Sequence, residues 1–534
     1  MNFLQHFRHH VQALAYGNPL YRMMLDQKPG PDSLRVALAD PWPGNAEAGQ
    51  ALMGRQDDLF EREGPENPAK SHYVLTHGWL KDLRAVGTEA AKRKARALIE
   101  DWLAHHDKWR EDSWAHDVLG ERISNWVCFY DFFAGSAFSD FSDRLIASMM
   151  RQWRHLMRTM PANLTGTESL LAIKGILMAG LSLTDGNEAL GLGLELLRRQ
   201  LFSEILADGG HISRNPLLQL QLLHSLIDIR AVLRAAGSDV PHELDTAIER
   251  MVPALKLFRH GDGGLALFNG AQEASPLEME AALTLSGARG RVLRRLPQMG
   301  YERLTSGRSL LLIDAGAPPP PPHDRTAHAG LLSFEFSIGR ERLIVNCGAG
   351  PDDDAEWRTA MAATAAHSTL TLKDTNACEV LPEGGIGQRP KHVTAQRYEQ
   401  EGSYFVEASH SGYENRFHVI HHRSLCLAAE GDELHGRDVL SGPAGRDFAV
   451  RWHLHPSVQA SLAQGGQAAI LRLPSNSGWR LRVDNAAQGS ELSLEPSVYG
   501  GGLSPRRSLQ IRVSGRTRED PTVINWLLAK EKKG

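Results

Sequence analysis

The chain has 534 residues, of which 42% are apolar and 23% charged, and its formal net charge is −4. This length exceeds what one hydrophobic core usually organises, so two or more domains are expected, and the composition excludes a largely disordered protein. The small negative charge gives no overall basic signal, so we expect no nucleic acid partner, while local basic patches that bind acidic ligands stay open. The four cysteines lie far apart without a CxxC pair: Cys128, Cys347, Cys378 and Cys426. This spacing fits neither a disulfide framework nor a zinc ribbon and favours reduced thiols in the cytoplasm.

The first residues, MNFLQHFRHHVQALAYGN, lack the apolar centre of a signal peptide. The most apolar segment covers residues 170–183 (LLAIKGILMAGLSL), but it is short and contains Lys174. A buried core helix is therefore expected there, not a membrane span. These features predict a cytoplasmic protein, while a periplasmic location stays open.

The first half of the chain has apolar residues spaced three and four apart, as amphipathic helices require. In residues 141–160, for example, one stripe contains Leu145, Met149, Trp153 and Leu156. Five helices are predicted in this half, at residues 90–109, 141–160, 168–183, 189–206 and 217–236. Short breaks with Gly, Pro, Asn or Asp separate them, and no exact repeat is found. The pattern predicts antiparallel helix pairs, stacked openly or closed into a toroid.

After about Gly290 the period changes to two, as in residues 332–338 (LSFEFSI). Further short strands are predicted at residues 342–345, 368–372, 404–408, 424–428, 469–473, 479–483 and 509–513. Alternating strands with turn residues about every ten positions predict an antiparallel sandwich. Residues 318–322 are five prolines, which predict an exposed loop. The predicted domains are residues 1–290 and 291–534.

Residues 208–216 (DGGHISRNP) interrupt the helical half with polar side chains. His211, Arg214 and Asn215 precede a helix that is expected to begin near Pro216. A helix N-terminus next to an arginine can bind a carboxylate or a phosphate. An ordinary helix–helix turn explains the same residues equally well, so both interpretations remain open.

Two other places gather polar residues. In residues 163–168 (NLTGTE), Thr165 or Thr167 can cap the following helix, and Glu168 suits its positive end. The second half contains a series of histidines: His328, His367, His410, His418, His421, His422, His453 and His455. Two of them that share a strand face can bind zinc, but a site needs a third ligand. The sequence has no nucleotide-binding loop, nucleophile elbow or HExxH motif.

These segments together resemble the heparinase II/III-like family of polysaccharide lyases, in its bacterial branch of unassigned substrate. The resemblance covers most of the chain, through residues 77–85 (HGWLKDLRA), 167–181, 208–216, 327–348, 357–372, 411–425 and 451–458. It implies an α+β multidomain protein, with an incomplete (α/α) toroid followed by an antiparallel β-sandwich. This agrees with the two periods found above.

The resemblance also implies β-elimination on an acidic, uronate-containing glycan. In that reaction one residue neutralises the uronate carboxylate, and Tyr or His side chains move the protons. By correspondence the catalytic candidates are His211, His328 and His367. The substrate-binding candidates are Arg214, Asn215, Glu168, Arg423 and Tyr413. A structural zinc, known for some members, would correspond to His328, Asn346 and His367, although asparagine is a poor zinc ligand.

The chain departs from the family pattern at its reactive positions. Thr167 and Glu168 stand where active lyases have Asn-His, and Leu218 and Gln219 stand where they have a tyrosine, often followed by His. Residues 326–330 (TAHAG) replace His-x-His-x-Asp, and Asn346 stands for an aspartate. Leucine cannot transfer a proton, and an ionised Glu168 would repel a uronate.

Three functions are consistent with this sequence. The first is a lyase with divergent catalytic residues, and the second is a non-catalytic glycan-binding or scaffold protein. The third is a glycoside hydrolase, which needs two carboxylates across a groove, and Glu168 and Asp208 are the candidates for these. The sequence predicts neither the sugar nor the oligomeric state.

Overall fold

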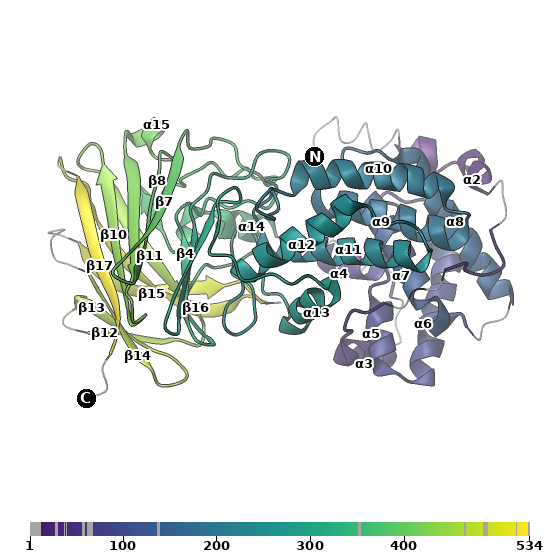
Figure 1. The fold of residues 1–534 in the computed structure, drawn as a ribbon, viewed down its shortest axis with the longest axis horizontal. Coiled ribbons are helices and arrows are strands. Elements are labelled where there is room, and N and C mark those ends of the chain that lie inside the picture. The colour runs from purple at the N-terminus through teal and green to yellow at the C-terminus, as the bar shows by residue number, and fades with distance from the viewer. Residues whose placement is uncertain are drawn as a thin grey trace. The chain divides into compact units, whose positions relative to one another are not determined.

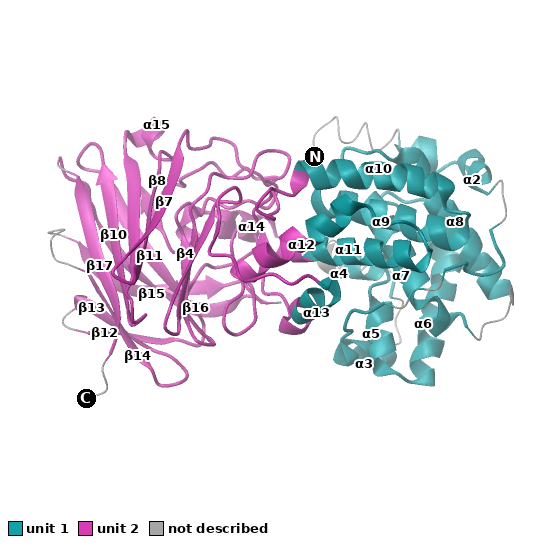
Figure 2. Ribbon diagram, in the orientation of Figure 1, with its two compact units in different colours: residues 1–203, 221–248, 280–287 teal, residues 204–220, 249–279, 288–534 magenta. Residues whose placement is uncertain are grey.

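The computed structural model describes residues 12–531, except for 27–29, 37, 39, 56–58, 61–67, 136–138, 351–353, 464–465, 484–489, 503 and 520. The chain divides into two compact units (Figure 2). The helical unit contains Met1–Ser203, Gln221–Ile248 and Glu280–Gly287, and the sheet unit contains Glu204–Leu220, Glu249–Met279 and Ala288–Gly534. The sheet unit therefore includes two segments from before residue 288. The domain limits of 1–290 and 291–534 remain a prediction.

Up to Ser286, the regular elements of the described residues are helices (Figure 1). They are α2 (Pro19–Leu25), α3 (Ala46–Gly54), α4 (Pro68–Leu75), α5 (Trp79–Val86), α6 (Glu89–Asp101), α7 (His116–Phe133), α8 (Ser139–Thr159), α9 (Gly166–Leu183), α10 (Asn187–Glu204), α11 (Pro216–Ala235), α12 (His242–Leu257) and α13 (Pro276–Ser286). A π-helical turn, Trp102–His106, follows α6. The predicted helices at 141–160, 168–183, 189–206 and 217–236 are confirmed as α8 to α11.

Apolar faces pack these helices together. The predicted stripe on α8 is buried, from Leu145 to Leu156. Helices α7 and α9 approach each other backbone to backbone, because a Cβ on Gly120 would lie 2.0 Å from the carbonyl oxygen of Leu171. Helix α9 is also the one described helix that is long and apolar enough to cross a membrane, but 78% of it is buried inside the protein. A buried core helix meets the same criteria, so this is weak support for a membrane span.

The strands of the sheet unit form two antiparallel sheets. They are β1 (Arg295–Leu296), β2 (Tyr301–Ser306), β3 (Ser309–Asp314), β4 (Phe334–Ile338), β5 (Glu341–Val345), β6 (Leu370–Leu372), β7 (Val393–Gln400), β8 (Ser403–His410), β9 (Ile420–Leu427), β10 (Glu433–Ser441), β11 (Asp447–Leu454), β12 (Gln459–Ala463), β13 (Ala468–Arg472), β14 (Gly478–Val483), β15 (Glu491–Tyr499), β16 (Arg506–Arg516) and β17 (Thr522–Lys530). One sheet has the order β1-β2-β3-β4-β5-β11-β16-β15, with β6 beside β11. The other has the order β12-β13-β14-β17-β10-β9-β8-β7. Two short helices, α14 (Ala355–Ala362) and α15 (Glu414–Phe417), interrupt the strands.

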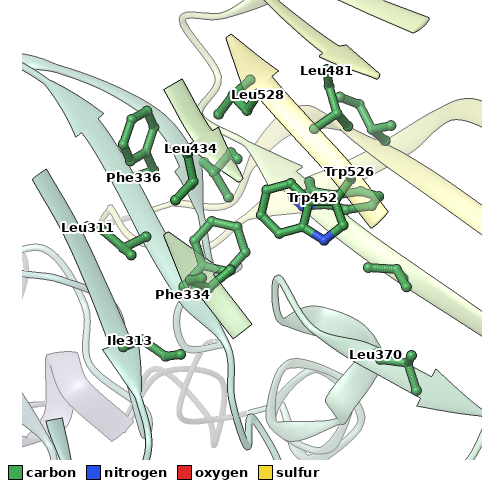
Figure 3. Packing of buried hydrophobic residues seen from close by; sticks show 14 of the residues in the cluster. Leu311, Ile313, Phe334, Phe336, Leu370, Leu434, Trp452, Leu481, Trp526 and Leu528 are labelled. Carbon is green, nitrogen blue, oxygen red and sulfur yellow. The ribbon is translucent and has the colours of Figure 1, made fainter. Parts of the chain in front are cut away.

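A single apolar cluster fills the space between the two sheets (Figure 3). Leu311 and Phe334 enter it from one sheet, and Leu434 and Trp526 enter it from the other. The rings of Phe334 and Trp526 stack with their centroids 5.7 Å apart. The alternation of buried and outward residues along β9 and β10 follows from this packing, because one face of the sheet is core and the other is not.

Candidate functional site

The polar break at residues 208–216 is the turn between α10 and α11. Asp208 fastens it, because its carboxylate accepts the backbone N–H of Gln298 at 2.8 Å. Gly209 has a positive φ, and a Cβ there would lie 2.1 Å from the carbonyl oxygen of Arg250. The turn therefore requires glycine at this position. Since its carboxylate is engaged by backbone amides, Asp208 is not the free acid that the glycoside hydrolase alternative needs.

His211 is fully buried in this turn, and both of its ring nitrogens are hydrogen-bonded. Nδ1 accepts the backbone N–H of Ser213 at 3.2 Å and lies 2.7 Å from the same residue's hydroxyl. A nitrogen that accepts an N–H carries no proton, so Nε2 carries it and donates to the carboxylate of Glu204 at 3.0 Å. On the other side of that carboxylate, Nδ1 of His323 lies 3.9 Å from its second oxygen. His211 is thus a buried donor to a glutamate.

Arg214 is buried, and its three nitrogen atoms all donate within the protein. Nε donates to the carbonyl of Met299 at 2.6 Å, and Nη2 is paired with the carboxylate of Asp314. Nη1 donates to the carbonyls of Gly316 at 3.3 Å and Ala317 at 2.8 Å. An arginine engaged in this way does not present its guanidinium to a uronate, in contrast to the substrate-binding role expected from the sequence.

Asn215 is the N-cap of α11. Its side-chain oxygen accepts the backbone N–H groups of Leu217 at 2.9 Å and Leu218 at 3.1 Å, and its amide donates to the carbonyl of Asn269 at 2.9 Å. Every part of the side chain thus has a structural partner. The turn interpretation accounts for Asn215, which the sequence also offered as a substrate-binding residue.

Gln219 occupies the position where family members often have a histidine after the tyrosine. Its Oε1 accepts the backbone N–H of His211 at 3.1 Å, and its Nε2 donates to the carbonyls of Gly209 and Met251 at 3.1 and 3.2 Å. The side chain is fully buried. Gln219 therefore stabilises the turn through hydrogen bonds to backbone groups.

His328 and His367 lie next to each other in the sheet unit, with Nδ1 of His328 3.1 Å from Nε2 of His367. The Nδ1 of His367 faces the carbonyl of Ala363 at 2.8 Å, and a carbonyl only accepts, so this nitrogen carries the proton. Burial lowers the pKa of His367 to about 4, so the ring is neutral and its Nε2 accepts from His328. Burial and the neighbouring His367 also hold the pKa of His328 well below its usual range. The lone pair of His328 is therefore on Nε2, which would lie 3.5 Å from a Cβ on Gly270.

The residues implied for a structural zinc do not fit one. The side-chain oxygen of Asn346 accepts the backbone N–H of Ser368 at 3.0 Å, and its backbone N–H donates to Glu335 at 3.1 Å. His328 and His367 each use one ring nitrogen in the hydrogen bond between them. Across the described ranges, no group of three or more His, Cys, Asp or Glu side chains is arranged to hold a metal ion.

Arg423 and Tyr413 lie inside the sandwich, each about 1% exposed. Arg423 donates through Nε to Asp438 at 2.7 Å, and the same carboxylate accepts from His421 at 2.7 Å. The hydroxyl of Tyr413 donates to the carbonyl of Leu370 at 2.8 Å. Neither side chain reaches the surface, which disfavours the substrate-binding role expected for both from the sequence.

Glu168 belongs to the helical unit, whereas the other predicted site residues belong to the sheet unit. It lies half-buried in the first turn of α9, next to the positive helix end, as expected. Thr165 is the N-cap residue of α9, but its side chain makes no capping hydrogen bond.

Sequence reasoning missed the partners that fix this site. Asp314 ends the apolar strand β3, and Asn269 stands in a loop before Gly270. The hydroxyl of Tyr301 donates to the carbonyl of Arg214 at 2.7 Å and accepts from Asn269 at 2.7 Å. Tyr301 therefore fastens the turn through its backbone, and its hydroxyl is occupied by these two bonds. An acidic residue at the end of an apolar run was the one available signal for Asp314.

The family model "Heparinase II/III-like, C-terminal" matches residues 288–527. FtsZ-localized protein C of Caulobacter vibrioides is 31% identical over 98% of this chain and 94% of its own length. Among solved structures, a heparinase III superposes with a TM-score of 0.74 at 12% identity, covering 93% of this chain and 85% of its own. Heparan sulfate lyase HepC from Pedobacter heparinus gives a TM-score of 0.62 at 16% identity, covering 98% of this chain and 90% of its own.

The chondroitin AC lyase of Streptomyces coelicolor also matches, with a TM-score of 0.55 at 10% identity over 98% of this chain and 82% of its own. At these identities the structural matches establish the fold, an (α/α) toroid with a β-sandwich, and they confirm the predicted fold class. The sequence matches over the C-terminal half and over the whole chain establish descent. This chain belongs to the heparinase II/III-like family.

Proposed function

We propose that this chain is a non-catalytic member of the lyase family, which acts by binding at the place in the cell where FtsZ is found. The observation that carries the proposal is the engagement of Arg214. Its guanidinium is paired with Asp314 and with backbone carbonyls, so the group best suited to neutralise a uronate carboxylate is already neutralised. Without that neutralisation, the C5 proton of a uronate is not made acidic enough to be removed.

Two further features support a role without chemistry. Leu218 stands at the position of the family tyrosine, and the neighbouring Gln219 fastens the backbone of the turn. His211 is enclosed between Ser213 and Glu204, with no exposed surface. A buried imidazole with both nitrogens bonded cannot exchange a proton with a substrate unless the turn opens.

The place of action is inferred from the relative. FtsZ-localized protein C matches this chain over nearly its whole length, which supports a shared place of action. The four cysteines are free thiols, which supports our proposal that the protein works in a reducing cytoplasm.

Imaging tests this proposal in the cell. A fluorescent fusion of the full chain should coincide with labelled FtsZ, and so should a His211→Ala, His328→Ala double variant, because neither histidine is needed for binding. Purified chain and purified FtsZ should also associate directly. A diffuse signal for the wild-type fusion, together with no association in solution, would rule the proposal out.

One observation favours the lyase interpretation as a second candidate. The lone pair of His328 is on Nε2, which faces Gly270 and takes part in no hydrogen bond with another histidine. A neutral imidazole with an available lone pair is a general base. If the chain is a lyase, it should release unsaturated sugars from a uronate polymer, and the His328→Ala variant should release none. Product formed equally by both proteins would exclude His328 as the base.

A further inference from the structure

Residues 316–326, which we call the strap, run from the end of β3 across the buried polar turn and contain the proline run. The strap covers Arg214 directly, because both hydrogen bonds of Arg214 Nη1 go to strap carbonyls, those of Gly316 and Ala317. The other bonds of the guanidinium, to Met299 and Asp314, do not involve the strap. Moving the strap away would therefore release Nη1 and leave the rest of the arginine in place.

A second arginine holds the strap at its middle. Nη1 of Arg389 donates to the carbonyls of Pro318 at 3.2 Å and Pro319 at 2.5 Å, and its Nη2 is paired with the carboxylate of Asp324. Asp324 also accepts the backbone N–H of Ile386 at 3.1 Å. Arg389, which lies outside the strap, therefore binds three strap residues.

Two glycines outside the strap allow close contact with the strap backbone. A Cβ on Gly384 would lie 2.7 Å from the carbonyl oxygen of Arg325, and one on Gly270 would lie 2.6 Å from that of Thr326. Both glycines have positive φ and let the strap backbone approach closely. The strap is therefore seated on a matching surface.

The closed strap nevertheless leaves a polar atom unsatisfied. Nδ1 of His323 is buried without a hydrogen-bond partner, and it lies 3.9 Å from the carboxylate of Glu204. The ring of His323 is 6.4 Å from that of His211. A buried polar atom without a partner costs free energy that opening to water would recover.

We propose that the strap is a self-inhibitory cover, latched by the Arg389–Asp324 ion pair, and that its opening exposes Nη1 of Arg214 as a binding site for a carboxylate. This inference goes beyond the proposed function, which does not depend on whether the strap is open or closed. The exposed prolines at 320–322 give a partner a place from which to pull the strap away.

Chemical labelling of the full-length chain tests the latch. Diethyl pyrocarbonate modifies accessible imidazoles, and mass spectrometry reports the rate at each histidine. In an Arg389→Ala variant the rates at His211 and His323 should rise about tenfold, because losing a charged hydrogen bond shifts the opening equilibrium by that order. Hydrogen exchange of residues 316–326 should rise in parallel. His435, whose side chain is 51% exposed, serves as the internal reference.

Arg480→Ala is the matched control, because Arg480 pairs with Glu531 at 2.7 Å and is 27% exposed, against 26% for Arg389. It should leave both histidine rates unchanged, and Asp324→Asn, a milder opening of the latch, should reproduce the Arg389→Ala effect. Unchanged labelling of His211 in both latch variants overturns the proposal. So does a rise that is equal across all peptides, because it reports general destabilisation.

A uronate assay on the same variant separates the two proposals. Fast labelling without unsaturated product supports the strap and the non-catalytic role together. Fast labelling with product supports the strap and contradicts the non-catalytic role. If glucuronate at saturating concentration slows the labelling of the open variant, the carboxylate site is supported, and if it has no effect, that part of the proposal is wrong.

Discussion

At the residue scale, the buried charges of this protein stabilise its fold. Arg423 and Asp438 are both fully enclosed between the sheets, and Asp438 also accepts from His421 and from the indole of Trp526 at 3.0 Å. The neighbouring Arg423 and His421 offset the effect of burial and lower the pKa of Asp438 well below its usual range. The carboxylate is therefore ionised and compensates the buried guanidinium.

Replacing Asp438 by Asn should destabilise the protein by about 3–5 kcal/mol, because it leaves Arg423 buried without a counter-charge. The loss is measured as a shift of the urea unfolding midpoint. Asp447→Asn is the control, since its ion pair with Arg516 is largely exposed and should change stability by less than about 1 kcal/mol. Equal effects of the two substitutions would contradict this account of the cluster.

The buried histidines predict how stability depends on pH. Burial lowers the pKa of His367 to about 4, below its value of 6.5 in an unfolded chain. Between these two values the unfolded chain binds the proton and the folded chain does not, so acid favours unfolding. The stability that comes from keeping His367 neutral is fully present above the unfolded pKa. The free energy of unfolding should therefore fall by about 1–2 kcal/mol between pH 7 and pH 5. His367→Gln should flatten this slope, which thermal unfolding at several pH values measures; a slope as steep as wild type would refute the assignment.

At the element scale, the α11 N-terminus joins the turn to the helix. Asn215→Ala removes both capping hydrogen bonds to the helix amides and should cost about 1–2 kcal/mol. Asn215→Ser keeps a capping oxygen and should cost less. The comparison of the two melting temperatures checks this. No difference between them would mean that the bond from Asn215 to Asn269, which both variants lose, carries the effect.

The elements that the sequence predicted best are those with one buried face. Helix α8 and strand β9 show a clear period because one side packs and the other is more exposed, and β4 shows one because polar Glu335 and Ser337 alternate with apolar residues, although all five of its residues are buried. Strand β3 (SLLLID) was missed because all six of its residues are buried, so no alternation marks it. Strand β17 was missed because its outward side also carries apolar residues, such as Val523 and Leu527.

The candidate site was placed in the sequence but could not be interpreted there. Residues 208–216 contain His211 and Arg214; the partners of His211 lie within eight residues of it, whereas those of Arg214 lie elsewhere in the chain. Asp314 follows Arg214 by 100 residues, and the strap carbonyl at Ala317 by 103. Only folding brings these groups together. The local sequence pattern therefore could not predict whether the guanidinium of Arg214 is free or paired.

At the scale of the whole molecule, the chain has the lyase architecture but encloses its candidate site. Two of the structural relatives, HepC and the chondroitin AC lyase, are named as lyases, whereas FtsZ-localized protein C, at 31% identity, is named for its location with FtsZ. Three features disfavour β-elimination: Arg214 is paired, a leucine stands at the family tyrosine position, and the strap covers the turn. Each removes or covers a group that β-elimination requires, and this is what the proposed non-catalytic role rests on.

The most direct test of this account is the ultraviolet detection of unsaturated sugars after incubation of the purified full chain with uronate polymers. The panel includes heparan sulfate, chondroitin sulfate, hyaluronan and alginate, with an active lyase as the positive control. The account predicts no product from any polymer at protein concentrations far above those the control needs. Product that forms with the wild type and disappears in His328→Ala would contradict it and establish a divergent lyase.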